Sequence, residues 1–372
     1  MPSAASGGFP RPVLPAHADT NDAGAYFNQG SVLISKDPLT AGYAFYWASR
    51  LDPSMAEAYY ARATSLQLAW YVHVVERFEA NAAPDTHPPT EIVARYDTLM
   101  TEALVRNPFF DRRFDLLLYP RGVRARMANS NDPEIQGYYA YAMHEWPKAA
   151  AAWAKVLMKH PEHLSLHARR AQAFYFQQEF DSAYAELQIY VDSLDARQQQ
   201  QVVRAYESKA ILRYSMAMVR RRQQRDDAAR DDFGAALTEN LSFSTAHVQL
   251  AQLDLIAGDT AAALGEFALA VEIRAADPVS RAEYGALLHQ LGRDEEALRQ
   301  LASAIALDAD YAPPYALLGR IHDSHGRTAE AVRAYEEYLR RGARNAADRP
   351  GVEQRLTALR AAGASSGGPA RY

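Results

Sequence analysis

The residues best suited to chemistry are few. The stretch HPEHLSLH, residues 160–167, places His163 and His167 four residues apart, so both can share one face of a helix, with His160 nearby. Imidazole is a common zinc ligand, but two imidazoles are an incomplete zinc set, and no HExxH pattern and no cysteine completes it. We therefore expect no metal site and no bound cofactor.

The stretch VRRRQQRDDAARDD, residues 219–232, concentrates positive charge and follows it at once with acids. Cations near a helix C-terminus and acids at the next N-terminus both complement the helix dipole. This favours a structural role for the cluster, and the alternative is a binding site for an acidic peptide or a phosphate.

Other motifs of catalysis are missing from the sequence: it has no glycine-rich phosphate loop, no GxSxG elbow and no Cys/His pair. We expect a protein that is not an enzyme. The net charge of −5, without a long basic stripe, argues against nucleic acid. The most apolar window, SLQLAWYVHVVERF, is interrupted by Gln67, His73 and Glu76 and is too short for a membrane span.

A 34-residue period organises the chain and would position any site. Gly258, Ala263, Phe267 and Ala270 recur as Gly292, Ala297, Leu301 and Ala304, then as Gly326, Ala331, Tyr335 and Tyr338. Within each unit, apolar residues recur at intervals of three and four residues in two separate blocks. This spacing predicts two helices joined as a hairpin. The glycine falls where the first helix ends, and a large side chain follows each second-helix alanine by four residues.

This pattern resembles the tetratricopeptide repeat (TPR) family. The resemblance implies an all-α fold, a right-handed α-solenoid of stacked antiparallel helix pairs. About eight units are expected over residues 22–345, after a disordered lead-in at 1–21 and before a capping helix at 346–362 and a flexible tail at 363–372. The units are 22–55, 56–108 with an insertion, 130–163, 164–197, 198–243 with an extended first helix, 244–277, 278–311 and 312–345, and residues 109–129 are irregular.

The resemblance also implies a protein-interaction scaffold that binds a peptide segment or partner subunit in a concave groove lined by first helices. By register, the candidate groove residues are Tyr138, Tyr141, Gln172, Tyr175, Tyr214, Met218, Arg221 and Gln252. Tyrosine suits such a surface because it offers apolar area and a polar tip. The alternative for each tyrosine is packing between neighbouring first helices.

Two other functions remain open. A regulatory module could bind an oligopeptide or small molecule near residues 66–129, because a detour in a regular array is often functional. An enzyme with its site in that region is the third hypothesis.

The start of the sequence does not read as a secretory signal, so we expect a cytoplasmic protein, or a secreted or periplasmic one if a signal peptide has been removed. High alanine and arginine usage is typical of a GC-rich bacterial genome. The sequence names neither the partner nor the oligomeric state.

Overall fold

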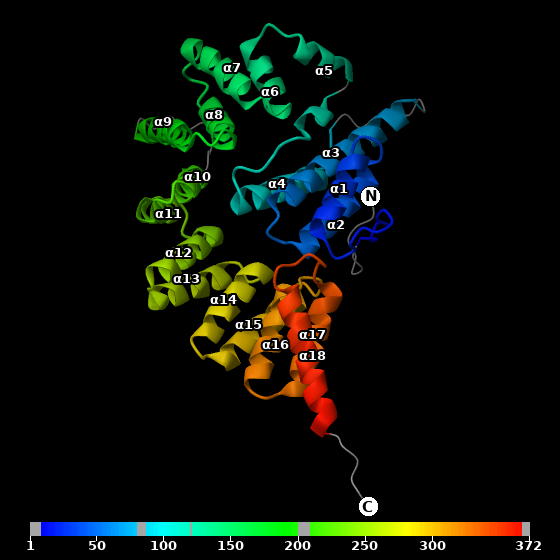
Figure 1. The fold of residues 1–372 in the computed structure, drawn as a ribbon. Helices are drawn as coiled ribbons and strands as arrows, with labels where there is room; N and C mark the ends of the chain where they lie inside the picture. The colour runs from blue at the N-terminus through cyan, green and yellow to red at the C-terminus, as the bar shows by residue number, and fades with distance from the viewer. Residues whose placement is uncertain (1–8, 80–86, 120, 200–208, 367–372) are drawn as a thin grey trace, which may run out of the picture. The chain divides into compact units, whose positions relative to one another are not determined.

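The computed structural model describes residues 9–79, 87–119, 121–199 and 209–366 (Figure 1). These residues form eighteen α-helices and one 3-10 helix, with no strand among them, which confirms the predicted all-α class. The chain divides into two compact units. Unit 1 comprises residues 1–58 and 264–372, and unit 2 comprises residues 59–263.

Unit 2 holds the middle of the chain. Its helices are α3 (Ala56–Glu79), which begins in unit 1, α4 (Thr90–Arg106), η1 (Asp115–Leu118), α5 (Arg121–Ala128), α6 (Pro133–Ala142), α7 (Trp146–Lys159), α8 (Ser165–Phe176), α9 (Phe180–Gln199), α10 (Lys209–Arg222), α11 (Asp226–Glu239) and α12 (Ser244–Ala257). An extension of the first helix was predicted at 198–209. Residues 198–199 instead form the end of α9, and residues 200–208 lie outside the described residues.

Unit 1 joins the two ends of the sequence. Its helices are α1 (Ala23–Leu33), α2 (Pro38–Leu51), α13 (Thr260–Ile273), whose first turn belongs to unit 2, α14 (Pro278–Gln290), α15 (Asp294–Leu307), α16 (Pro313–Ser324), α17 (Thr328–Arg341) and α18 (Arg349–Ser366). Val352, Leu356 and Leu359 of α18 pack against Tyr335 and Tyr338 of α17. A capping helix was predicted at 346–362, and α18 begins at residue 349 and runs four residues into the predicted tail.

Consecutive helices pack as hairpins, as the repeat predicts. The paired helices include α6 with α7, α8 with α9, α10 with α11, α14 with α15, and α16 with α17. In each pair the second-helix alanine and the large side chain four residues later are buried, as with Ala149 and Trp153 or Ala229 and Phe233. Small residues on the first helix make room for that side chain.

The turn between paired helices keeps one backbone conformation whether or not glycine is present. Gly258, Gly292 and Gly326 have φ of 80°, 71° and 68°, and the equivalent residues His144, Gln178 and Gln224 have φ of 61°, 63° and 59°. The closing hydrogen bond is also shared: Arg293 N donates to Leu288 O at 2.8 Å, and Arg225 N donates to Arg220 O at 3.0 Å. Three turns therefore hold a side chain in the left-handed region that glycine occupies without steric cost.

We expect Gln224→Gly to raise the free energy of unfolding by about 0.5–1 kcal/mol, because the left-handed conformation penalises a Cβ atom more than glycine's extra chain entropy costs. Urea denaturation followed by circular dichroism measures the change. Gly292→Gln is the reverse substitution at the equivalent turn and should destabilise. A destabilising Gln224→Gly would show that the glutamine side chain itself stabilises the turn.

Residues 9–21 lie within the predicted disordered lead-in, yet they pack against α1 and α2. Phe9 stacks on Tyr43 with ring centroids 5.3 Å apart, and its carbonyl accepts a hydrogen bond from Trp47 Nε1 at 3.1 Å. The guanidinium of Arg11 lies 4.6 Å from the Trp47 ring centroid. The prediction was wrong for residues 9–21 because the aromatic side chains of α2 bind this otherwise irregular segment.

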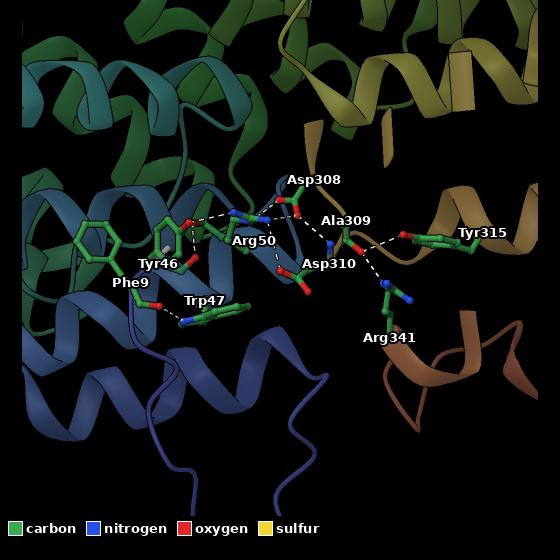
Figure 2. Close-up of polar contacts among 10 residues, drawn as sticks. Phe9, Tyr46, Trp47, Arg50, Asp308, Ala309, Asp310, Tyr315 and Arg341 are labelled. Atoms are coloured by element: carbon green, nitrogen blue, oxygen red, sulfur yellow. Dashed lines mark hydrogen bonds and ion pairs between the residues drawn. The ribbon is translucent and has the colours of Figure 1, made fainter. Parts of the chain in front are cut away.

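The amino-terminal hairpin is bound to the carboxy-terminal repeats through Arg50 (Figure 2). Arg50 of α2 donates to Asp308 Oδ1 at 2.7 Å and also lies 3.4 Å from Asp310 Oδ2, in the loop between α15 and α16. Nearby, Tyr315 Oη and Arg341 Nε both donate to the carbonyl of Ala309. Residues 258 positions apart in sequence thus meet within unit 1, a contact that the linear repeat pattern does not indicate.

Candidate peptide-binding surface

The irregular segment 107–119 lies against first helices of unit 2. Gln172 of α8 donates from Nε2 to the carbonyl of Pro108 at 3.0 Å. Phe109 stacks on Tyr175 with ring centroids 3.9 Å apart and planes 5° from parallel. Asp111 Oδ1 lies 3.0 Å from His144 Nε2. The chain's own segment therefore occupies part of the surface where a peptide was predicted to bind.

Phe109 anchors this segment. Only 3% of it is exposed, and it packs in one cluster with Ala171, Leu187 and Met216. Just before it, Val105 of α4 packs against the buried cluster of α10, α11 and α12. The face that α6, α8, α10 and α12 present to these residues is hereafter the first-helix surface.

Two predicted site residues are part of the core. Tyr141 is 3% exposed, and its ring lies between Trp146 and Trp153 at centroid distances of 4.9 and 5.7 Å. Tyr214 is fully buried against Phe233 and Phe243. For these two tyrosines the structure shows the packing role that the sequence left open.

Tyr138 differs because it remains accessible. Its side chain is 36% exposed, and its ring meets Trp153 edge-on at 5.5 Å. The guanidinium of Arg169, on α8, lies 5.9 Å from the Tyr138 ring centroid. An aromatic ring with a neighbouring cation is a suitable contact for an acidic or aromatic side chain of a partner.

The remaining predicted residues lie on α10 and α12. Arg221 donates to Gln252 Oε1 at 3.1 Å and also to Gln249, so the structure brings the predicted Arg221 and Gln252 together. Met218 is partly buried between two apolar clusters. Arg221 therefore forms part of a polar group that is half-buried on the first-helix surface.

The arginines of the basic segment have structural partners. The guanidinium of Arg220 lies 3.6 Å from the Tyr184 ring centroid, and its Nε lies 4.0 Å from Asp232 Oδ2. Tyr184 Oη donates to Asp232 Oδ1 at 3.3 Å. Burial raises the pKa of Asp232 to about 6, in spite of the nearby Arg220 charge. These contacts among α9, α10 and α11 favour the structural interpretation of the segment.

The raised pKa of Asp232 predicts a pH effect on stability. Between about pH 4 and pH 6 the folded chain keeps a proton on Asp232 that the unfolded chain has released. The wild-type free energy of unfolding should therefore fall, as the pH rises through that window, by on the order of 2 kcal/mol. The Asp232→Asn variant should lack this pH-dependent fall in the free energy of unfolding. Urea titrations of both proteins at pH 4.5, 6 and 8 test it, and a constant difference between them would contradict the expectation.

A cluster of charged residues that the sequence did not single out lies beside this surface. Tyr60 Oη donates to Asp115 Oδ1 at 2.8 Å and accepts from the amide of Phe114 at 3.0 Å. The Nε of Arg112 is buried with no hydrogen-bond partner among the described residues. Burial, and then the charge of Arg112, lowers the pKa of Arg169. The motif RRFD at 112–115 was the only sequence signal, and it matches no known pattern.

The second half of α3 carries an exposed apolar stripe. Tyr71, Val72, Val75 and Phe78 are exposed, with Phe78 70% exposed. Their spacing places Tyr71, Val75 and Phe78 on one side of the helix. This stripe falls in the region 66–129 that the sequence marked as a detour, and apolar side chains exposed together are typical of an interaction site.

Comparisons with known proteins give structural matches only. No family model and no curated protein matches the chain. Among solved structures, the Cut9–Hcn1 complex matches with 11% identity over 90% of this chain and 76% of that chain, with a TM-score of 0.45. MamA matches with 16% identity over 50% of this chain and 94% of its own, with a TM-score of 0.40. A tetratricopeptide repeat protein from Parabacteroides merdae matches with 12% identity over 79% and 99%, with a TM-score of 0.39.

The helix pairs, their 34-residue period and their shared left-handed turn define the class of the fold as an array of stacked helical hairpins. Tetratricopeptide-repeat proteins are among the solved structures to which this chain is similar. In the described part of the chain, no helix combines the length and apolar character needed to cross a membrane.

Proposed function

We propose that this protein is an interaction scaffold that binds an extended segment of a partner protein on the first-helix surface, beside its own segment 107–119. The observation that carries the proposal is the way α8 holds that segment. Gln172 binds a backbone carbonyl and Tyr175 stacks on an aromatic ring. Those two contacts recognise an extended peptide with little dependence on its remaining side chains.

Exposed and half-buried residues next to the resident segment define where a partner would bind. Tyr138 supplies an exposed aromatic ring, and Arg169 supplies a cation beside it. Arg221 and Gln252 supply hydrogen-bonding groups on α10 and α12. Because Phe109 is almost fully buried, we expect the partner to bind next to the segment without displacing it.

Site-specific photo-crosslinking tests this proposal in the full chain. A crosslinking amino acid replaces Tyr138 on the first-helix surface, Phe78 on the α3 stripe, or Met158, which is 78% exposed on α7 and serves as the matched control. We expect one protein to be crosslinked from Tyr138 and not from Met158. Crosslinking from Phe78 alone would move the binding site to the α3 stripe. Equal crosslinking from all three positions would contradict specific binding.

A second candidate function is the binding of a small anionic ligand in the 66–129 region. It rests on Arg169, which interacts electrostatically with both Arg112 and the carboxylate of Asp115. The Nε of Arg112 is buried and has no hydrogen-bond partner in the described part of the chain. A bound phosphate or carboxylate would neutralise the second guanidinium charge, which Asp115 alone leaves uncompensated. Saturable thermal stabilisation by phosphate or succinate that is lost in Arg112→Gln would favour this function over the scaffold.

A further inference from the structure

A cluster of potential metal ligands lies in the turn between α7 and α8. His160, Glu162 and His163 each offer one ligand atom, and these atoms all lie within 4.8 Å of one another. His160 Nδ1 is 3.2 Å from Glu162 Oε1, and the two imidazole rings are 5.4 Å apart and 22° from parallel. The sequence pointed instead to His163 and His167 as the pair that share a face.

The structure separates that pair. His167 is buried, with Nδ1 2.7 Å from Glu186 Oε2, and Arg170 Nη1 lies 2.6 Å from the other oxygen of the same carboxylate. The side chain of His167 is therefore held in a buried contact with Glu186. His163 points away from it, toward Glu134 of α6, whose Oε2 lies 3.9 Å from His163 Nδ1. Glu162, which no sequence pattern singled out, takes the third position.

We propose that His160, Glu162 and His163 bind a divalent transition-metal ion. Two imidazoles and one carboxylate are a ligand set that Zn²⁺ and similar ions accept, with the remaining positions open to water or to a further ligand. Two atoms bound to one zinc ion lie about 3.4 Å apart, as metal–ligand distances near 2.1 Å require. The three side chains are exposed, so small rotations can bring their atoms from the present spacing to that one.

The surrounding charges favour a cation. Glu162 contributes an exposed carboxylate to the cluster. Glu134 adds a second carboxylate beside His163. Lys159, next to His160 in sequence, is the nearest cation along the chain. A bound ion would fix the α7–α8 turn next to the start of α6.

Isothermal titration of the full chain with Zn²⁺ tests the site. We expect one saturable site and a rise in the thermal midpoint with Zn²⁺. His160→Ala and Glu162→Gln should each weaken binding by about tenfold or more. Both residues are exposed, so the variants should stay folded.

His73→Ala removes an exposed imidazole of α3 and is the matched control, which should bind Zn²⁺ as the wild type does. The proposal is overturned if the wild type shows no saturable site. It is equally overturned if His160→Ala and Glu162→Gln bind as tightly as His73→Ala does. Neither result bears on partner binding at Tyr138, so the two proposals are tested separately.

Discussion

Phe109→Ala is expected to lower the free energy of unfolding of unit 2 by about 3–5 kcal/mol, the largest effect that we predict for one substitution. The ring is 3% exposed, stacks on Tyr175 and fills the cluster that contains Ala171 and Met216. Alanine would leave a cavity there and would release the segment that starts at residue 107. Urea denaturation monitored by tryptophan fluorescence measures the loss, because the four tryptophans include Trp146 and Trp153 of unit 2.

Tyr119→Ala is the matched control, since Tyr119 is an exposed aromatic residue of the same segment and should change stability by less than about 0.5 kcal/mol. Limited proteolysis gives a second readout: cleavage within 107–119 should accelerate in Phe109→Ala and not in Tyr119→Ala. A loss below about 1 kcal/mol for Phe109→Ala, without faster cleavage, would show that Phe109 does not hold the segment in place.

Gly137→Ala is expected to cost about 3 kcal/mol although it adds a single methyl group. A Cβ atom at Gly137 would stand 2.2 Å from Nε1 and 2.4 Å from Cδ1 of Trp153, closer than real contacts allow. Trp153 is fully buried, so its indole has no space to move into, and the two helices α6 and α7 must separate. The free energy of unfolding in urea measures the cost.

Gly234→Ala is the control, because Gly234 lies within α11 and no atom lies within 4 Å of its added Cβ. There alanine should stabilise by about 0.5–1 kcal/mol through helix propensity and lower chain entropy. Opposite signs at the two glycines would confirm that close helix approach, and not helix propensity, selects glycine at 137. The same sign at both would refute that explanation.

The sequence by itself determined the repeat. Small residues and large ones alternate at fixed positions over 34 residues, and each helix must bury one face against its neighbour, so the hairpins follow from local periodicity. Even the left-handed turns at His144, Gln178 and Gln224 follow from the period, because they occupy the positions of Gly258 and its equivalents. Packing of the paired helices overrides the local preference of those three residues.

The sequence could not determine the contacts between distant segments. The binding of Arg50 to Asp308, the packing of Phe9 on α2 and the place of Phe109 beside Tyr175 each join residues with no fixed spacing in the chain. For the same reason, the repeat register assigned all three tyrosines to the groove, but Tyr141 and Tyr214 lie in the core and only Tyr138 stays accessible. Periodicity assigns a residue to a face of its helix. Which segment covers that face is decided by the tertiary structure, because burying an apolar side chain depends on the neighbour that reaches it.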